Sequence, residues 1–379
     1  MRLLTVHSTL DPASGGGNAA RTLQLSRVLT DLGVDCSIAT SRDGLAEVAG
    51  DLDGIEVVSL PTVGGRFRVP SGSLGAFRRA VRRADLLLLM NHWTVLNALA
   101  YRAARRERKP HVVCPGGALH LFGRSRRCKQ LYNALTGREL VRRAAGHIAI
   151  VPHEIDDFVA YGVPREVVTV IPNGVPPSRP APDGAAFCRE HGLGAAPFFL
   201  YLGRLAPIKG PDLLLAAFAD RRDELRPWRL VIAGYDEGMR AELLAAARAL
   251  AIADRVHFVG FLAEGPKQQA LAAADLLVLP SRRDVMSIVV LEAAAAGRPV
   301  LVTDRCGLVD VAKVGGGWVV PASVEGLAGG LVEAAAGRAE LAARGQAWRR
   351  FALAEFGWPR VAALHLELFE RVLGGRVEA

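Results

Sequence analysis

Residues 280–300 read PSRRDVMSIVVLEAAAAGRPV and follow a buried strand pattern, DLLVL at 275–279. The proline and serine that open the stretch end the strand. An alanine-rich helix is predicted over residues 287–296, because a glycine and a proline then close it in the usual order. A further strand is predicted over residues 300–303. Strand, loop, helix and strand form the unit in which an open α/β sheet places a ligand at a helix N-terminus.

Two carboxylates frame this helix. Asp284 lies just before it, and Glu292 lies eight residues further on, about two helical turns along. Glu292 is the only charged residue from 285 to 297. Its side chain either reaches solvent, as charges on alanine-rich helices often do, or belongs to a site. Two cations elsewhere in the chain favour a site.

The composition is that of a large globular protein. With 379 residues, 50% hydrophobic and 22% charged, the chain has room for two domains with large cores. No apolar run approaches the roughly 20 residues of a membrane span, and no secretory signal is recognised at the N-terminus. Five cysteines without a C-x-x-C pair argue against a disulfide framework or a zinc site. We therefore expect a cytoplasmic protein.

Positive charge is concentrated in the first half. The net charge is +9, but residues 66–143 hold eighteen Lys or Arg and three acidic residues, a net +15. Arginine clusters recur at helical spacing in 78–83 and 102–106, and a third basic cluster occupies 124–129. The pattern indicates an acidic partner, either an anionic membrane surface or a lipid-phosphate acceptor. A solvated basic face is the alternative. Nucleic acid is not expected, because no recognition motif or stacking aromatic series accompanies the charge.

A glycine-rich turn follows the first predicted strand. The strand covers residues 1–9, the turn 11–18 and the next helix 19–32. Without a Cβ, glycine lets backbone N–H groups approach an anion closely, although a plain tight turn is the alternative interpretation. The three glycines concerned are Gly15, Gly16 and Gly17.

Two histidines are candidates for catalysis because each lies where a strand ends. His92 follows the buried strand 85–90, and His120 follows a flexible turn at 115–118. His7 is a weaker third candidate. A lone histidine is more often structural than catalytic, so that interpretation stays open for each of them.

Two cations mark the second half. The strand 198–202 is followed by GRLAPIKG at 203–210, so Arg204 and Lys209 stand at a strand-to-helix junction. Two cations and a helix N-terminus make a site for a doubly charged anion such as a diphosphate. A proline-rich stretch at 172–182 precedes this half, and we place the hinge there.

The segments IPNGV, GRLAPIKG, IAGYDEG, VGFL, PSRRD…LEAAAAGRPV and FGW occur in this order between residues 171 and 358. This series resembles the retaining nucleotide-sugar glycosyltransferases of family 4, most nearly those that build cell-surface polysaccharides or lipid-linked glycans. The resemblance implies the α/β fold called GT-B, two Rossmann-like domains facing across a cleft. Residues 1–175, with the C-terminal helix 358–379, would form the acceptor domain, and residues 176–357 the donor domain.

The resemblance also implies roles for particular residues. Arg204 and Lys209 would hold the donor diphosphate, Glu292 would accept the ribose hydroxyls, and Asp284 would contact the transferred sugar. The N-terminus of the helix that carries Glu292 would face the donor. The backbone within the fourth motif, VGFL, would face the base, and the glycine turn would close over the phosphates of the donor. The residues concerned are Ser287 and Ile288, then Gly260, Phe261 and Leu262, and Gly15 to Gly17.

Three departures from the family pattern concern the sugar and the acceptor. Asp284 stands where the family has glutamate, and Met286-Ser287 stand where it has Phe-Gly. Glycine occupies the segment 114–117 where the family often has a histidine, and whether His92 or His120 replaces it is left open.

We therefore expect transfer of a sugar, with retention, from a UDP- or GDP-linked donor to a hydroxyl of a glycan or lipid-linked acceptor. The sequence has no Asp-x-Asp metal motif, so no metal or other cofactor is expected, and the leaving phosphate would take the acceptor's proton. Two alternatives remain: a sugar phosphotransferase or epimerase on the same scaffold, and a non-catalytic protein that binds nucleotide sugars. The basic first half would allow peripheral contact with the inner face of the membrane.

Overall fold

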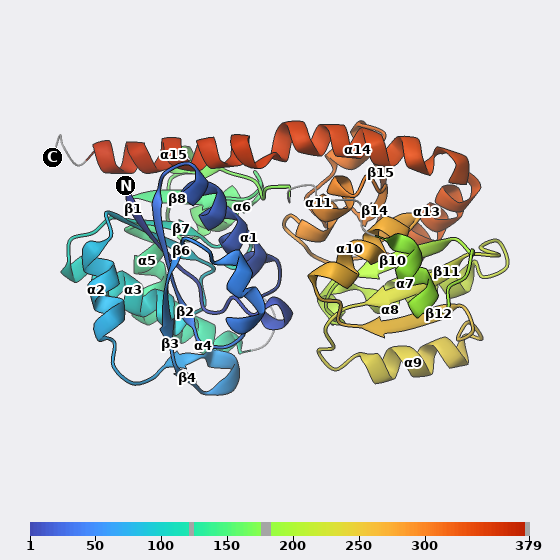
Figure 1. Ribbon diagram of the computed structural model, residues 1–379, viewed down its shortest axis with the longest axis horizontal. Helices are drawn as coiled ribbons and strands as arrows, with labels where there is room; N and C mark the ends of the chain where they lie inside the picture. The colour runs from blue at the N-terminus through green and yellow to red at the C-terminus, as the bar shows by residue number, and fades with distance from the viewer. Residues whose placement is uncertain (121–124, 176–182, 376–379) are drawn as a thin grey trace. The chain divides into compact units, whose positions relative to one another are not determined.

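The computed structural model describes residues 1–120, 125–175 and 183–375 (Figure 1). Two compact units account for the chain. Unit 1 comprises Met1–Gly174 and Trp358–Ala379, and unit 2 comprises Val175–Gly357. In the described part of the chain, no helix combines the length and the apolar character needed to cross a bilayer.

Unit 1 is built on a parallel sheet of seven strands in the order β3-β2-β1-β6-β7-β8-β9. The order reverses between β1 and β6, which are neighbours in the sheet although other strands and helices separate them in the chain. A short antiparallel hairpin, β4 and β5, stands apart from the sheet. The strands are β1 Arg2–Val6, β2 Asp35–Ser41, β3 Glu56–Leu60, β4 Thr62–Val63, β5 Val69–Pro70, β6 Leu86–Met90, β7 His111–Cys114, β8 Gly146–Ala149 and β9 Val168–Val170.

Helices cover the sheet because its central strands are apolar on both faces. All five residues of β6, LLLLM, are buried, as parallel strands packed on both sides require. The returning C-terminal helix α15 packs against α1 and β8 of this unit. The helices of unit 1 are α1 Pro12–Asp31, α2 Gly75–Arg83, α3 Val95–Arg106, α4 Arg126–Tyr132, α5 Arg138–Arg142, α6 Glu154–Ala160 and α15 Trp358–Gly374.

The glycine turn predicted at residues 11–18 is shorter in the structure, because helix begins before the glycines. The range Pro12–Asp31 of α1 joins two helical pieces across Gly16, where φ of +58° and ψ of −150° are not helical, so a break in the helix does occur among the three glycines. Asp11 explains the early start, because its carboxylate accepts a hydrogen bond from the Ser14 backbone N–H at 3.3 Å, the pattern of an N-cap. Further along unit 1, a π-helical turn, Asn133–Gly137, lies between α4 and α5.

Unit 2 has a parallel sheet of six strands in the order β12-β11-β10-β13-β14-β15. The predicted strand–loop–helix–strand segment is confirmed as β13, α11 and β14. The strands are β10 Phe198–Leu202, β11 Arg229–Ala233, β12 Val256–Gly260, β13 Leu276–Leu279, β14 Val300–Thr303 and β15 Gly317–Val320. The helices are α7 Gly184–Glu190, α8 Pro211–Asp220, α9 Arg240–Ala249, α10 Glu264–Ala273, α11 Ile288–Ala295, α12 Asp310–Lys313, α13 Val324–Ala336 and α14 Leu341–Phe356.

Buried histidines make the stability of unit 1 depend on pH. Burial lowers the pKa of His7 and of His92 to about 4, and that of His365 on α15 to about 3. In the unfolded chain each ring has a pKa of about 6.5. Below that pH the unfolded state binds more protons than the folded state, so acid destabilises the fold.

We predict that the free energy of unfolding falls as the pH is lowered from about 6.5 to about 4. Each buried histidine contributes up to about 1.4 kcal/mol per pH unit. His365→Leu should make this slope shallower by one such contribution, as measured by urea unfolding at several pH values. His153→Leu, at an exposed position, is the matched control and should leave the slope unchanged. An unchanged slope in His365→Leu would contradict the assignment.

Candidate functional site

The order of the strands in unit 2 brings two loops together. β10 pairs with β11 on one side and with β13 on the other, so the loops after β10 and β13 leave the same edge of the sheet where the strand order reverses. The first loop carries Lys209 and the second carries Asp284. The Lys209 Nζ atom lies 2.5 Å from Asp284 Oδ2, and these side chains are 20% and 14% exposed. The fold thus joins two residues that lie 75 positions apart in the chain.

Backbone contacts hold the two loops against each other. The Arg282 N–H donates to the Ile208 carbonyl at 2.9 Å. The Arg282 guanidinium donates to both carboxylate oxygens of Asp212 on α8, at 2.8 and 2.6 Å. Burial favours the neutral form of Asp212, but these hydrogen bonds outweigh it and hold its pKa below the ordinary value. Gly210, with φ +69°, lies so close to the second loop that a Cβ would sit 2.1 Å from the Pro280 carbonyl oxygen.

Arg204 lies in the same first loop but pairs with a different segment. Its guanidinium donates to Glu237, which follows β11, and both side chains are about two-fifths exposed. The Tyr201 hydroxyl donates to the Arg204 carbonyl at 2.6 Å and fixes the backbone there. Arg204 and Lys209 therefore share a loop, while their carboxylate partners come from neighbouring strand ends.

Helix α11 begins beside Asp284 and carries Glu292. Ser287 precedes its first residue, Ile288, and both are 8% exposed. Glu292 does not reach solvent, since its side chain is only 5% exposed. Its Oε1 accepts a hydrogen bond from Lys267 Nζ at 2.6 Å. The solvent-facing alternative for Glu292 is thereby removed.

The predicted base-facing segment runs from the end of β12 into α10. Gly260 has φ +78°, Phe261 is 47% exposed and Leu262 is 9% exposed. The chain then enters α10, the helix that carries Lys267. The predicted base-facing segment and Lys267, the partner of Glu292, therefore belong to one continuous stretch of the chain.

In unit 1, polar groups gather where β1 and β6 end. The His7 ring is 1% exposed and hydrogen bonds through Nδ1 to the Thr9 carbonyl at 2.5 Å. Because the ring is neutral near pH 7, Nδ1 is the donor here and Nε2 accepts from the Asn91 amide at 3.0 Å. Asn18 of α1, just beyond the three glycines, donates to the Asn91 side-chain oxygen. The glycine segment therefore lies at the point where the strand order of unit 1 reverses.

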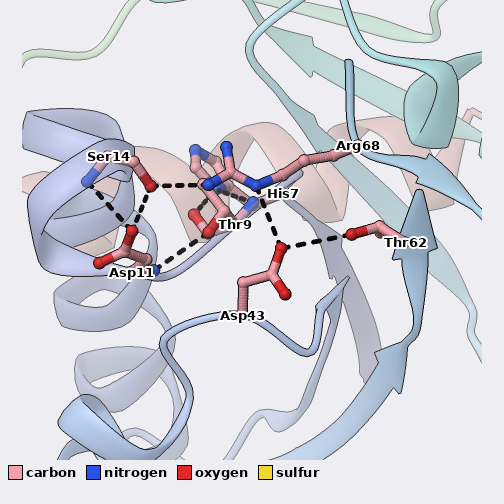
Figure 2. Close-up of polar contacts among 7 residues, drawn as sticks. All are labelled: His7, Thr9, Asp11, Ser14, Asp43, Thr62 and Arg68. Carbon is pink, nitrogen blue, oxygen red and sulfur yellow. Dashed lines mark hydrogen bonds and ion pairs between the residues drawn. The ribbon is translucent and has the colours of Figure 1, made fainter. Parts of the chain in front are cut away.

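Figure 2 shows a cation above the start of α1. Arg68, from the hairpin segment between β4 and β5, donates to the Ser14 hydroxyl at 2.7 Å, and its Nε lies 3.5 Å from Asp43 Oδ2. Thr62 donates to the same Asp43 oxygen at 3.3 Å. Arg68 has φ +41°, uncommon for a residue with a side chain. The hairpin thereby places a guanidinium next to the glycine segment.

The two candidate histidines lie in different surroundings. His92 is 1% exposed, and its Nε2 donates to the Asn133 side-chain oxygen at 3.1 Å. The His92 ring packs edge-on against three aromatic side chains, those of Trp93, Tyr132 and Tyr161. These contacts favour a packing role. The His120 ring is half exposed and its Nδ1 lies 3.6 Å from Asp157 Oδ1.

Comparison with known proteins agrees with this geometry. The model described as "Glycosyl transferases group 1" matches residues 189–348, and the model "Glycosyl transferase 4-like domain" matches residues 16–174. A D-inositol 3-phosphate glycosyltransferase of Actinosynnema mirum is 30% identical, over 92% of this chain and 94% of that protein. Mannosylfructose-phosphate synthase of Agrobacterium fabrum is 27% identical, over 80% and 75%.

The crystal structure of Anabaena Alr3699/HepE in complex with UDP and glucose is similar in fold. It has a TM-score of 0.80 at 21% identity and covers 98% of this chain and 100% of that one. The chain belongs to the GT4-type glycosyltransferases. Its two α/β units form the GT-B fold that the sequence predicted.

Three charged residues of this glycosyltransferase are not distinguished by any sequence pattern. Lys267 looks like one more surface lysine in a polar stretch, Arg282 belongs to an adjacent arginine pair, and Arg68 sits in a short hairpin. Spacing alone carries no signal for them, because each acts through a partner distant in the chain. Arg124, in the third basic cluster, and residues 176–182 of the predicted hinge lie outside the described residues.

Gly210 offers a test of the loop contact in the glycosyltransferase. Gly210→Ala combines a positive φ with a clash against Pro280, whereas Gly192→Ala has a similar φ of +62° and open space around it. Both should lose about 1 kcal/mol of stability from backbone strain. Gly210→Ala should lose at least about 1 kcal/mol more, because overpacking shifts the backbone. Equal thermal denaturation midpoints of the two variants would contradict the close approach.

Proposed function

We propose that this glycosyltransferase moves a sugar from a UDP- or GDP-linked donor to an acceptor hydroxyl, with retention at the anomeric carbon and without a metal ion. The observation that carries the proposal is the contact between Lys209 and Asp284. The two residues lie at the sheet edge of unit 2 where the strand order reverses. Open α/β sheets bind ligands at such an edge. The Anabaena protein, crystallised in complex with UDP and glucose, supports a nucleotide-sugar donor.

In this proposal the cations of the first loop stabilise the leaving diphosphate. Arg204 and Lys209 bind its oxygens, and the backbone N–H groups at the start of α11, near Ser287 and Ile288, add positive potential. Negative charge grows on the diphosphate as the glycosidic bond breaks, so these groups bind the transition state more strongly than the ground state. Asp284, which contacts Lys209 in the structure, is then free to contact the transferred sugar.

The rest of the donor is assigned to neighbouring groups of unit 2. Glu292 accepts the ribose hydroxyls, and the backbone of Gly260, Phe261 and Leu262 faces the base. The leaving phosphate takes the proton of the acceptor hydroxyl, so no protein base is needed. This agrees with a His92 ring that is buried and has a pKa lowered to about 4 by burial.

The acceptor is proposed to carry an anionic group, as a lipid-linked glycan does. The excess of positive charge in residues 66–143 supports it. The names of the two relatives, which refer to D-inositol 3-phosphate and mannosylfructose phosphate, also support an acceptor with a phosphate. Arg68, beside Ser14 at the start of α1, is the group of unit 1 that we assign to the phosphate of the acceptor.

The central test is Lys209→Ala with radiolabelled nucleotide sugars and chromatography of the products. We expect turnover to fall by at least about 100-fold, the loss typical of removing one group that stabilises transition-state charge. Lys313→Ala, an exposed lysine of the same unit, is the control and should keep wild-type turnover. Near-normal turnover in Lys209→Ala with an unchanged melting temperature would defeat the diphosphate assignment. If the wild-type protein gives an epimerised donor or a transferred phosphate, the first alternative function is favoured. If wild type binds nucleotide sugars and gives no product, the non-catalytic alternative is favoured.

A second part of the proposal concerns the membrane. The segment from α4 to α5 exposes Leu131 and Leu135, 60% and 66% accessible. Leu135 lines a pocket together with Arg138, Arg142 and Arg143 and with one acid, Glu139, which pairs with Arg143. An arginine near an anionic membrane surface contributes about 1 kcal/mol to the free energy of binding, and a leucine that becomes buried in the membrane contributes about 1.5–3 kcal/mol. We propose that this face contacts the anionic leaflet on the cytoplasmic side.

We predict that the protein sediments with vesicles containing anionic phospholipid and not with neutral vesicles. Leu131→Ser/Leu135→Ser should reduce the bound fraction several-fold at low salt, because the apolar contribution is lost. Leu32→Ser, at an exposed leucine of unit 1 outside this face, is the control. Equal binding by the double variant and by wild type would count against this face.

A further inference from the structure

Lys267 is a buried cation to which neither the sequence motifs nor the comparisons give a role. Its Nζ atom donates to Glu292 Oε1 at 2.6 Å and lies 2.8 Å from Glu264 Oε2. The Lys267 side chain is 18% exposed, while that of Glu264 is 46% exposed. The lysine therefore joins a carboxylate inside unit 2 to one at its surface.

Glu292 lies on an apolar stretch of α11. Its neighbours on α11, Val290, Leu291, Ala293 and Ala294, are apolar and fully buried. Within the described part of the chain, Lys267 makes the only hydrogen bond to the Glu292 side chain. Lys267 engages Oε1, so Oε2 is left to accept from a ligand.

The Lys267 ammonium favours the charged form of Glu292, although burial leaves the pKa of this carboxyl above its ordinary value. Burial also lowers the pKa of Lys267, but Glu292 and Glu264 outweigh it and the pKa is raised. Lys267 and Glu264, both on α10, are the charged groups that act on Glu292. Without Lys267, the carboxylate would be a buried charge with no counter-ion, which is costly.

We propose that Lys267 is a positioning residue for the nucleotide. Its ammonium donates to one oxygen of Glu292 and fixes the orientation of the carboxyl group, so that the other oxygen accepts the ribose hydroxyls of the donor. This inference rests on the proposed function, in which Glu292 takes the ribose. Since Lys267 lies on the helix that follows Gly260–Leu262, the segment assigned to the base also fixes the group assigned to the ribose.

The test compares ribose recognition in wild type and in Lys267→Met by isothermal titration calorimetry. The ligands are UDP and GDP, their 2′-deoxy counterparts and inorganic pyrophosphate. We expect wild type to bind the ribonucleotide at least about tenfold more tightly than its 2′-deoxy counterpart. Without the 2′-hydroxyl, Glu292 has no hydrogen-bond donor from the ribose at that position. In Lys267→Met this ratio should fall toward one, while the affinity for pyrophosphate stays within about twofold of wild type.

Two further variants separate positioning from general damage. Lys267→Arg keeps the charge and should restore most of the ratio, and Lys313→Met should match wild type. If Lys267→Met does not fold, Lys267→Gln, which keeps a donor, should show a smaller loss of the ratio. If a folded Lys267→Met or Lys267→Gln keeps the wild-type ratio of ribonucleotide to deoxynucleotide affinity, the inference about Lys267 is overturned and the proposed function is not. A wild type that binds nucleotide without preference for ribose overturns the ribose assignment of Glu292 in the proposed function, and the inference with it.

Discussion

The ion pair between Lys209 and Asp284 exists because two loops of unit 2 leave one edge of the sheet. β10 has β13 as its neighbour, so the chain segments that follow these strands must pass each other. At Gly210 the loops come so close that the Pro280 carbonyl occupies the space a Cβ would need. The Arg282 N–H links the second loop to the first by donating to the Ile208 carbonyl. A larger residue at 210 would separate the loops and with them the charges. The ion pair of unit 2 therefore depends on a backbone contact that has no charge itself.

The cations of unit 2 differ in how readily they can change partners. Arg204 and Glu237 form an exposed pair, a kind worth about 0–1 kcal/mol, so a diphosphate can replace the carboxylate at little cost. Lys209 is more buried, and its release from Asp284 frees a carboxylate beside the proposed sugar position. Lys267 and Glu292 are the most enclosed of these pairs, and breaking a buried pair costs several kcal/mol. The first two pairs suit exchange during binding, and the third suits a fixed support.

Much of this arrangement could be predicted from the sequence, because it rests on local patterns. The alternation of apolar strands with helices predicted the two sheets, and Gly297 with Pro299 marked the end of α11. Arg204, Lys209 and Asp284 were singled out because each follows a predicted strand. The structure places all three at the same edge of the parallel sheet, and their roles stay predictions. Long-range pairing was not predictable in this way. Lys267 meets Glu292 across 25 residues, and Arg68 reaches Ser14 across 54, with no periodicity linking either pair.

The start of α1 shows how one polar side chain overrides composition only in part. Three glycines predicted a turn, since glycine is unfavourable inside a helix by about 1 kcal/mol. Asp11 caps a first helical turn, and Gly16 then takes a non-helical conformation that separates this turn from the rest of α1. This break keeps backbone N–H groups near the end of β1, which is what a phosphate contact requires.

The two sheets reverse their strand order in the same way, yet the groups gathered there differ in charge. At the reversal in unit 1, a neutral His7, Asn91 and Asn18 form an uncharged chain of hydrogen bonds, with Arg68 set to one side over Ser14. At the reversal in unit 2, ammonium and carboxylate groups face each other. Uncharged donors and acceptors suit the hydroxyls of a sugar, and cations suit a diphosphate. The same topology thus supplies two chemically distinct edges, which suit the proposed transfer from a nucleotide-linked donor to an acceptor hydroxyl.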